Sequence, residues 1–200
     1  ISMGGGADYD EDGQLDFVSM DYEYGLELYS GDGHGDFWYQ PVQLAGTPLF
    51  VIGAGADYDE DGHADFIAVD DAEQLVLARG DGHARFSAVT LSAWAGDVLA
   101  LGGGADLSGD RHADFVQVRD DGSTWLYLGD GRGHFSFEPL SLEGGPLRLI
   151  GAARDHSGDG APDLVAVNEA GEGLLYVAQG TLSFERRSLG DGWDRVRFLD

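Results

Sequence analysis

One acidic motif recurs in this chain at a constant interval. It has the form Asp-x-Asp-x-Asp-Gly-x-x-Asp, complete in two copies and eroded in two. Its copies begin, at a spacing of 49 residues each time, at Asp8, Asp57, Asp106 and Asp155. A fixed period of this length is the signature of a repeat architecture, in which each unit buries its core against its neighbours. The sequence predicts a single repeat domain over residues 1–200. Its units fall at about 1–49, 50–98, 99–147 and 148–196.

The oxygen-bearing side chains of this motif are spaced as a calcium ion requires. Calcium takes about six to eight oxygen ligands, and carboxylates at loop positions 1, 3 and 5 converge when the chain curls around the ion. A glycine at position 6 permits the turn, position 7 offers a backbone carbonyl, and a carboxylate at position 9 completes the shell. We therefore expect about one Ca²⁺ per repeat, up to four in all. The expected ligands are Asp8, Asp10, Asp12, Gln14 and Asp16; Asp57, Asp59, Asp61, His63 and Asp65; Asp106, Ser108, Asp110, His112 and Asp114; and Asp155, Ser157, Asp159, Ala161 and Asp163.

Two alternatives to this calcium loop agree less well with the sequence. An EF-hand needs a glutamate at position 12. That position holds Ser19, Ala68, Gln117 and Ala166. An acidic turn without metal would crowd like charges without a counter-charge. Serine at position 3 predicts weaker binding in loops three and four, and Arg111 replaces the position-6 glycine, so metal binding by loop three stays open.

Charge and composition exclude several classes of partner. The formal net charge of −26 opposes binding to nucleic acid and to anionic membrane surfaces. Without cysteine, the chain has no disulfide framework and no zinc–thiolate site. No apolar stretch reaches the roughly 18 residues of a membrane-spanning helix, so we expect no membrane insertion. The chain does not begin with methionine and has no signal-peptide pattern, and we expect a mature or excised segment.

Short apolar segments follow each motif in the same order. The first, for example Asp65-Phe-Ile-Ala-Val69, is typical of a strand buried on both faces. A second strand leads to a glycine-rich turn, in which Asp-Gly pairs predict hairpins. A further strand begins at Phe37, Phe86, Phe135 and Phe184. Each unit thus predicts four short antiparallel strands, and such sheets bury both faces when they pack around an axis. The predicted fold is an all-β propeller of four 49-residue blades with calcium loops.

These motifs resemble a known repeat. The run Ala-Asp-x-Asp-x-Asp-Gly-x-x-Asp-Phe, followed by a strand and Gly-Asp-Gly-x-Gly-x-Phe, is similar to the FG-GAP/VCBS repeat, the blade of integrin α-subunit propellers and of many bacterial and fungal surface proteins. The resemblance covers essentially the whole chain. It implies calcium in the turn between the first and second strands of each blade, and an extracellular or cell-surface location.

The number of repeats departs from this family, whose propellers usually have more than four blades. Residues 1–4 share the phase of residues 197–200, so the chain holds four units plus a short duplication. Three interpretations stay open: a fragment of a longer array, one half of an eight-bladed homodimer, or a closed four-bladed ring.

Three functions are compatible with the sequence. The first is a non-catalytic calcium-binding module for extracellular recognition or adhesion, with a protein or carbohydrate ligand. The others are a structural or assembly segment of a larger secreted protein and an accessory propeller of a polysaccharide-acting enzyme. Catalytic residues should break the repeat, because chemistry needs a unique constellation. His63 and His112 instead keep its phase, and we predict that the chain is not an enzyme.

Tryptophans on predicted loops are candidate ligand contacts. Trp94 and Trp193 lie between the last strand of one unit and the first strand of the next, where an exposed ring could stack on a sugar or anchor a protein. The alternative is that each ring fills a gap between blades. Trp38 and Trp125 lie within predicted strands and are expected to pack.

Overall fold

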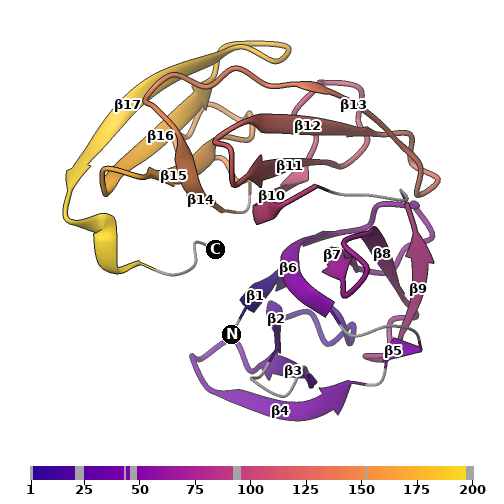
Figure 1. The fold of residues 1–200 in the computed structure, drawn as a ribbon. Helices are drawn as coiled ribbons and strands as arrows, with labels where there is room; N and C mark the ends of the chain where they lie inside the picture. Colours follow the sequence, from indigo (N-terminus) through magenta and orange to yellow (C-terminus); the bar gives the residue numbers. More distant parts are fainter. Residues whose placement is uncertain are drawn as a thin grey trace.

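Four β-sheets, each built on four antiparallel strands, stand around a common centre (Figure 1). The computed structural model describes residues 2–20, 25–42, 44–45, 49–91, 96–151 and 153–196. Blade 1 contains β1 (Ser2–Ala7), β2 (Asp16–Met20), β3 (Leu26–Gly31) and β4 (Phe37–Val42). Blade 2 contains β6 (Leu49–Ala56), β7 (Asp65–Asp70), β8 (Leu75–Gly80) and β9 (Phe86–Thr90), with β5 (Leu44–Ala45) as an added edge strand.

The second half of the chain repeats this plan. Blade 3 contains β10 (Val98–Ala105), β11 (Asp114–Arg119), β12 (Thr124–Gly129) and β13 (Phe135–Pro139). Blade 4 contains β14 (Leu147–Ile150), β15 (Leu164–Asn168), β16 (Glu172–Ala178) and β17 (Phe184–Asp191). The short 3₁₀ helix η1 (Trp193–Arg195) follows β17. The predicted all-β propeller of four four-stranded antiparallel blades is confirmed.

A register shift interrupts the pairing of the innermost strand near its end in the first three blades. The register between β1 and β2 shifts between Gly5 and Ala7, and that between β10 and β11 shifts between Gly103 and Ala105. The skipped residues Gly6 and Gly104 have φ of 77° and 84°, a backbone region in which a side chain would be strained. A bulge bends its strand and re-aims the chain. Here it directs the chain out of the sheet and into the acidic loop.

The hydrophobic core is divided among the blade interfaces. One cluster joins blades 1 and 2 and includes Val18, Leu28 and Phe66. A second joins blades 2 and 3, and a third joins blades 3 and 4. The innermost strands of consecutive blades also pack on one another, β1 on β6, β6 on β10 and β10 on β14. Because each sheet is apolar on both faces, a blade cannot bury itself without a neighbour.

A tyrosine from one blade fills the next blade in the chain. Tyr9 lies at position 2 of the first acidic loop and is 1% exposed, with its ring centroid 6.2 Å from Phe66 and 5.5 Å from Phe86 of blade 2. Tyr58 inserts in the same way into blade 3. These rings contact the aromatic edges of the neighbouring sheet, a favourable geometry for aromatic pairs. The acidic loops therefore also hold adjacent blades together.

Replacement of this inserted tyrosine should destabilise the whole array. Tyr58→Ala leaves a cavity at the interface of blades 2 and 3, and we expect a loss of about 3–5 kcal/mol in the free energy of unfolding. Trp38→Ala is the control, because Trp38 is 66% exposed and its loss should cost under about 1 kcal/mol. Urea unfolding followed by circular dichroism measures both. Equal effects of the two substitutions would contradict this packing.

Two tryptophan predictions have different outcomes. Trp38 was expected to pack, and that expectation is wrong, because it lies on the outermost strand β4 and points into solvent. Trp125 does pack. Its ring is partly buried, and the Arg119 guanidinium lies over it at 4.7 Å. Within the described ranges, no helix is long and apolar enough to cross a membrane.

Candidate metal centres

Each acidic loop joins the innermost strand of its blade to the next strand, the place that the resemblance implied for calcium. The loop backbone is curled around its own position-1 aspartate. In the first loop the Asp12 N–H donates to Asp8 Oδ1 (3.1 Å) and the Gly13 N–H donates to Asp8 Oδ2 (2.9 Å). Equivalent bonds are made to the other position-1 residues, Asp57, Asp106 and Asp155. All four loops thus share one backbone frame.

The position-5 aspartates complete this frame. The Gln14 N–H donates to Asp12 Oδ1 (2.8 Å), and the three other loops repeat the bond from position 7 to position 5. These bonds orient two carboxylates in each loop without any ion. The proposed ligand role of the position-7 carbonyls stays a prediction.

The position-9 aspartates tie each loop to the body of its blade. Both carboxylate oxygens accept backbone N–H bonds, one from the loop and one from the residue that ends, or nearly ends, the third strand. The donors are Tyr9 and Gly31 to Asp16, Tyr58 and Gly80 to Asp65, Leu107 and Gly129 to Asp114, and Ser157 and Ala178 to Asp163. All four carboxylates are at most 2% exposed. Their first role is structural, and each still has lone pairs that could face an ion.

Burial raises the pKa of the carboxyl groups of Asp16, Asp65 and Asp114. Desolvation is the largest cause for Asp65, whose pKa is raised to about 7 against the opposing hydrogen bond from Gly80. Desolvation also raises the pKa of Asp16 and of Asp114. Nearby aspartates of the same loop add to the shift, because like charges oppose ionisation. A bound cation would act in the opposite direction.

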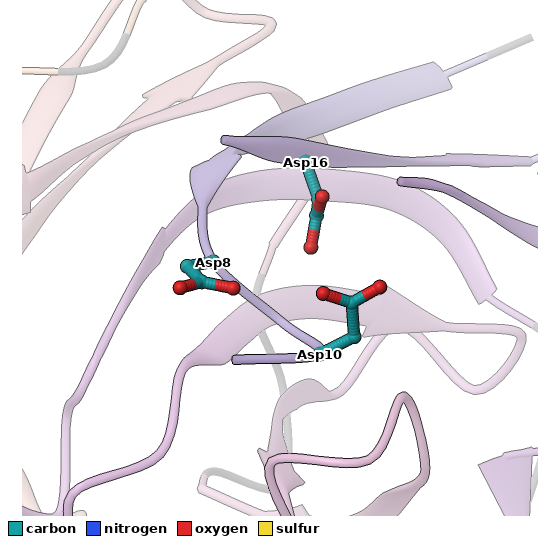
Figure 2. Close-up of side chains that lie close together, drawn as sticks. All are labelled: Asp8, Asp10 and Asp16. Atoms are coloured by element: carbon teal, nitrogen blue, oxygen red, sulfur yellow. The ribbon is translucent and has the colours of Figure 1, made fainter. Parts of the chain in front are cut away.

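Two loops gather three carboxylates closely enough for one ion. In loop one, oxygens of Asp8, Asp10 and Asp16 all lie within 4.8 Å of one another, and Figure 2 shows the three side chains projecting into a common space. In loop two the group is Asp57, Asp59 and Asp61, so position 5 takes the place that position 9 has in loop one. Three clustered carboxylate oxygens are a hard donor set that fits calcium. Among the described residues, loops three and four gather no such group, in line with serine at position 3.

Loop two also carries an internal counter-charge. Asp59 Oδ2 lies 3.0 Å from Nε of Arg79, which projects from β8, and the Asp59 side chain is only 9% exposed. The corresponding residue of blade 1 is Ser30, so loop one has no arginine at this place. A cation in loop two would therefore compete with Arg79 for Asp59, which predicts tighter binding in loop one.

Neighbouring loops are linked by glutamate–histidine pairs that the sequence did not reveal. Glu11, at position 4 of loop one, contacts the His63 ring at position 7 of loop two. Glu60 Oε1 lies 2.6 Å from His112 Nδ1 of loop three. Each glutamate raises the pKa of its histidine through this hydrogen bond. The repeated Glu at position 4 and His at position 7 of the following loop was the available signal.

Loop three closes without its glycine. The position-6 glycines of the other loops have φ of 89°, 97° and 91°, and Arg111 takes φ of 79° to keep the same turn. A non-glycine residue in this region is strained by about 1–2 kcal/mol. Loop three therefore keeps the backbone conformation of the other loops, and Arg111 adopts the strained conformation.

The two predicted ligand-binding tryptophans are placed unequally. Trp94 lies outside the described residues. Trp193, in η1, is partly buried with its ring over Gly173, where an added Cβ would lie 2.6 Å from ring atoms. Arg148 donates to its carbonyl oxygen. Trp193 therefore packs on blade 4, and its ligand-binding role stays a prediction.

Fold and loops together define a β-propeller built from acidic-loop blades. The model of the FG-GAP-like repeat matches residues 8–68 and 106–166, more than half of the chain. The protein belongs to the FG-GAP-like repeat family. No curated protein sequence matches it.

Solved structures show the same fold at low identity. The chain is similar to the BP39L lectin from Burkholderia pseudomallei, with a TM-score of 0.60 and 17% identity over 96% of this chain and 55% of that one. It is also similar to AofleA from Arthrobotrys oligospora, with a TM-score of 0.53 and 11% identity over 94% of this chain and 55% of that one. The chain thus spans little more than half the length of either structure.

Without metal, the protein should lose stability as pH rises. The folded state holds the Asp65 proton up to about pH 7, whereas an unfolded carboxyl releases it near 3.8, so the folded state binds more protons in between. This contribution is complete below about pH 4 and is lost toward pH 7, at up to about 1.4 kcal/mol per pH unit for one group. Asp16 and Asp114 act in the same direction. The hydrogen bond from the His34 N–H lowers the pKa of exposed Asp32, which acts in the opposite direction. Solvent screens this group, so its effect on stability is small.

Urea unfolding in chelator between about pH 4.5 and 7.5 measures this dependence. The same titration in excess calcium is the control, because a cation that favours the ionised carboxylates should weaken or reverse the slope. Stability that rises with pH in chelator would contradict the prediction.

Relief of the strain in loop three should stabilise the protein. Arg111→Gly should raise the free energy of unfolding by about 1 kcal/mol, since glycine adopts the left-handed region without a Cβ clash. Gly62→Ala at the same position of loop two is the matched reverse change and should lower it by a similar amount. Thermal and urea unfolding of both variants decide the point. A destabilising Arg111→Gly would mean that the arginine side chain contributes more than its strain costs.

Proposed function

We propose that this protein is a non-catalytic, calcium-binding propeller module that acts outside the cell and recognises a ligand there. The calcium proposal is supported mainly by one observation. Carboxylate oxygens of Asp8, Asp10 and Asp16 lie close together in a loop whose backbone is already folded around Asp8. A bound ion would supply the positive charge that this cluster lacks. We propose that Asp57, Asp59 and Asp61 hold a second ion, and that loops three and four bind more weakly.

Loop chemistry should determine calcium affinity. Asp10→Ser gives loop one the position-3 residue of loops three and four, and the lost carboxylate should weaken its site by about tenfold or more. Ser157→Asp makes the reverse change in loop four and should strengthen binding there. Isothermal calorimetry with calcium, with chelated wild type as reference, measures both. The proposal is wrong if wild type takes up no calcium at millimolar concentration, or if Asp10→Ser binds it as wild type does.

An extracellular setting is supported by the donor set. The loops present oxygen ligands on short turns, and extracellular calcium modules work at about 10⁻⁴–10⁻³ M. A membership of the FG-GAP-like family is consistent with that setting. A dissociation constant in the nanomolar range would instead favour a cytosolic calcium buffer.

A non-catalytic role is supported by the way the polar residues follow the repeat. His63 and His112 keep the same phase and are each engaged with a glutamate of the preceding loop. The buried carboxylates likewise recur in every blade and accept backbone bonds. A catalytic site needs a set of groups that converge once. The histidines and buried aspartates recur in several blades instead, which is typical of residues with a structural role.

A groove between blades 1 and 2 is the best-supported place for a ligand. It has a volume of about 530 Å³, within the usual range for small-molecule sites. Its lining residues are Gln40, Pro41, His83, Ala84, Arg85 and Phe86. Trp38 lies two residues before Gln40 on β4, so both side chains project from the same face of that strand. An exposed indole on the face of β4 that carries Gln40, together with the imidazole and guanidinium groups of the groove, suits a carbohydrate, and the likeness in fold to a lectin agrees with this class.

Binding to a glycan array in calcium, followed by titration of any hit, tests this site. Trp38→Ala should abolish or weaken binding by about tenfold or more, whereas Phe137→Ala, a change of another exposed aromatic on blade 3, should leave it unchanged. Glycan binding that survives Trp38→Ala would place the site elsewhere. Absence of glycan binding, with calcium uptake intact, would favour a protein ligand.

A further inference from the structure

Blades 1 and 3 carry the same cluster of four aromatic rings on one face, here called the aromatic ladder. Its members are Phe17, Tyr29, Phe37 and Tyr39 in blade 1 and Phe115, Tyr127, Phe135 and Phe137 in blade 3. The first two rings stack at 4.6 Å in blade 1 and 4.4 Å in blade 3, with planes 7° and 9° apart. The first and third lie 5.1 and 5.0 Å apart, and the second and fourth 5.7 and 5.5 Å. The two ladders have one shape.

The ladder of blade 3 is the receiving half of a blade interface. Tyr58 of blade 2 lies on it, with ring centroids 6.3 Å from Phe115 and 5.7 Å from Phe135. The Gly133 N–H of blade 3 also donates to the Tyr58 carbonyl oxygen (3.2 Å). As a result Phe115 is 1% exposed. Blade 2 receives Tyr9 in the same manner, through ring contacts and a bond from the Ala84 N–H.

The ladder of blade 1 is exposed although it has the same geometry. Phe37 is 47% exposed and Tyr39 is 66% exposed, and Phe17 is only partly buried. Leu15, at position 8 of the first loop, is 63% exposed, whereas the equivalent Ala64 packs against the core between blades 1 and 2. A contiguous apolar surface of this kind marks an interaction site.

The inserting half of the same interface is exposed on blade 4. His156 occupies position 2 of loop four, the place of Tyr9 and Tyr58, and is exposed. In the same blade, Leu175 is partly exposed and Leu189 is 43% exposed. Their equivalents in blade 3, Leu126 and Leu140, are buried. Trp193 covers only the end of this face farther from the loop, over Gly173.

We propose that blade 4 of a second copy of this chain docks on the aromatic ladder of blade 1, with His156 in the place that Tyr9 and Tyr58 fill inside the chain. The contact would continue an interface that the chain already builds between blades 1 and 2 and between blades 2 and 3. An imidazole can pack on aromatic rings, and apolar surface on both sides would be removed from water. Within one chain Arg154 donates to the Gly6 carbonyl, yet the ladder of blade 1 stays exposed.

Two such contacts can close a symmetric pair. Each chain offers one ladder and one inserting loop, so two copies related by a twofold axis satisfy both halves at both junctions. The ring would then contain eight blades.

Sedimentation velocity in calcium, at several protein concentrations and at about 0.15 M salt, tests the proposal. We expect a species of twice the 21.3 kDa chain mass. Phe37→Glu on the ladder and His156→Glu on the inserting loop should each yield a monomer, because Phe37 holds the place of Phe135, which Tyr58 contacts, and a charge there would be buried without a partner. Phe137→Glu is the control, since it adds the same charge to a ladder ring that is 60% exposed even where blade 2 covers the ladder of blade 3.

Circular dichroism and thermal unfolding verify that each variant is folded. An assembly that both test variants abolish and the control preserves supports the proposal. A wild-type monomer throughout the concentration range would overturn it, and so would equal loss of assembly in all three variants. Calcium uptake and glycan binding are read separately, so this outcome does not depend on the proposed function.

Discussion

One buried carboxylate in each blade is the interaction on which the rest of this structure depends. In blade 1, Asp16 accepts one N–H from the acidic loop and another from Gly31, fifteen residues away at the end of β3. It thereby fixes the loop to the hairpin that follows. The loop donor is Tyr9 itself, whose ring enters blade 2. A single side chain thus connects loop closure, strand pairing and the hydrophobic contact between blades, and each of the other blades repeats the bond pair.

This arrangement places charge where water is excluded. A buried carboxylate is costly unless hydrogen bonds or an opposite charge compensate it. The backbone hydrogen bonds compensate only part of the desolvation cost, and the pKa of Asp65 is raised for this reason. In loop two Arg79 offsets the charge of Asp59, whereas loop one gathers Asp8, Asp10 and Asp16 without an arginine at the equivalent place. Because the chain has a net charge of −26, a bound divalent cation would neutralise part of the negative charge in these loops.

The repeat made most of the fold predictable. A constant period, an apolar segment after each motif and the Asp-Gly turns were enough to give four blades of four strands. The predicted unit boundaries and the ligand set stay predictions. What the sequence did not reveal depends on three-dimensional neighbours: Glu11 reaches His63 because its left-handed backbone (φ 60°) projects the side chain toward the next blade. Trp38 looked like a packed strand residue because periodicity does not distinguish an outermost strand from an inner one. The exposure of the blade 1 ladder likewise depends on what faces it, since the ladder of blade 3 has the same geometry and is covered by Tyr58.

Hydrogen exchange of individual backbone amides tests the central role of the buried carboxylates most directly. The amides of Gly31, Gly80, Gly129 and Ala178 should be among the slowest in the protein, in calcium and in chelator alike, because opening them requires a blade to come apart. The loop amides of Gly13 and Gly62, bonded to the position-1 aspartates, should exchange much faster once calcium is removed. If the four strand-end amides exchange as fast as the loop amides in chelator, the buried aspartates do not hold the blades together and this account is wrong.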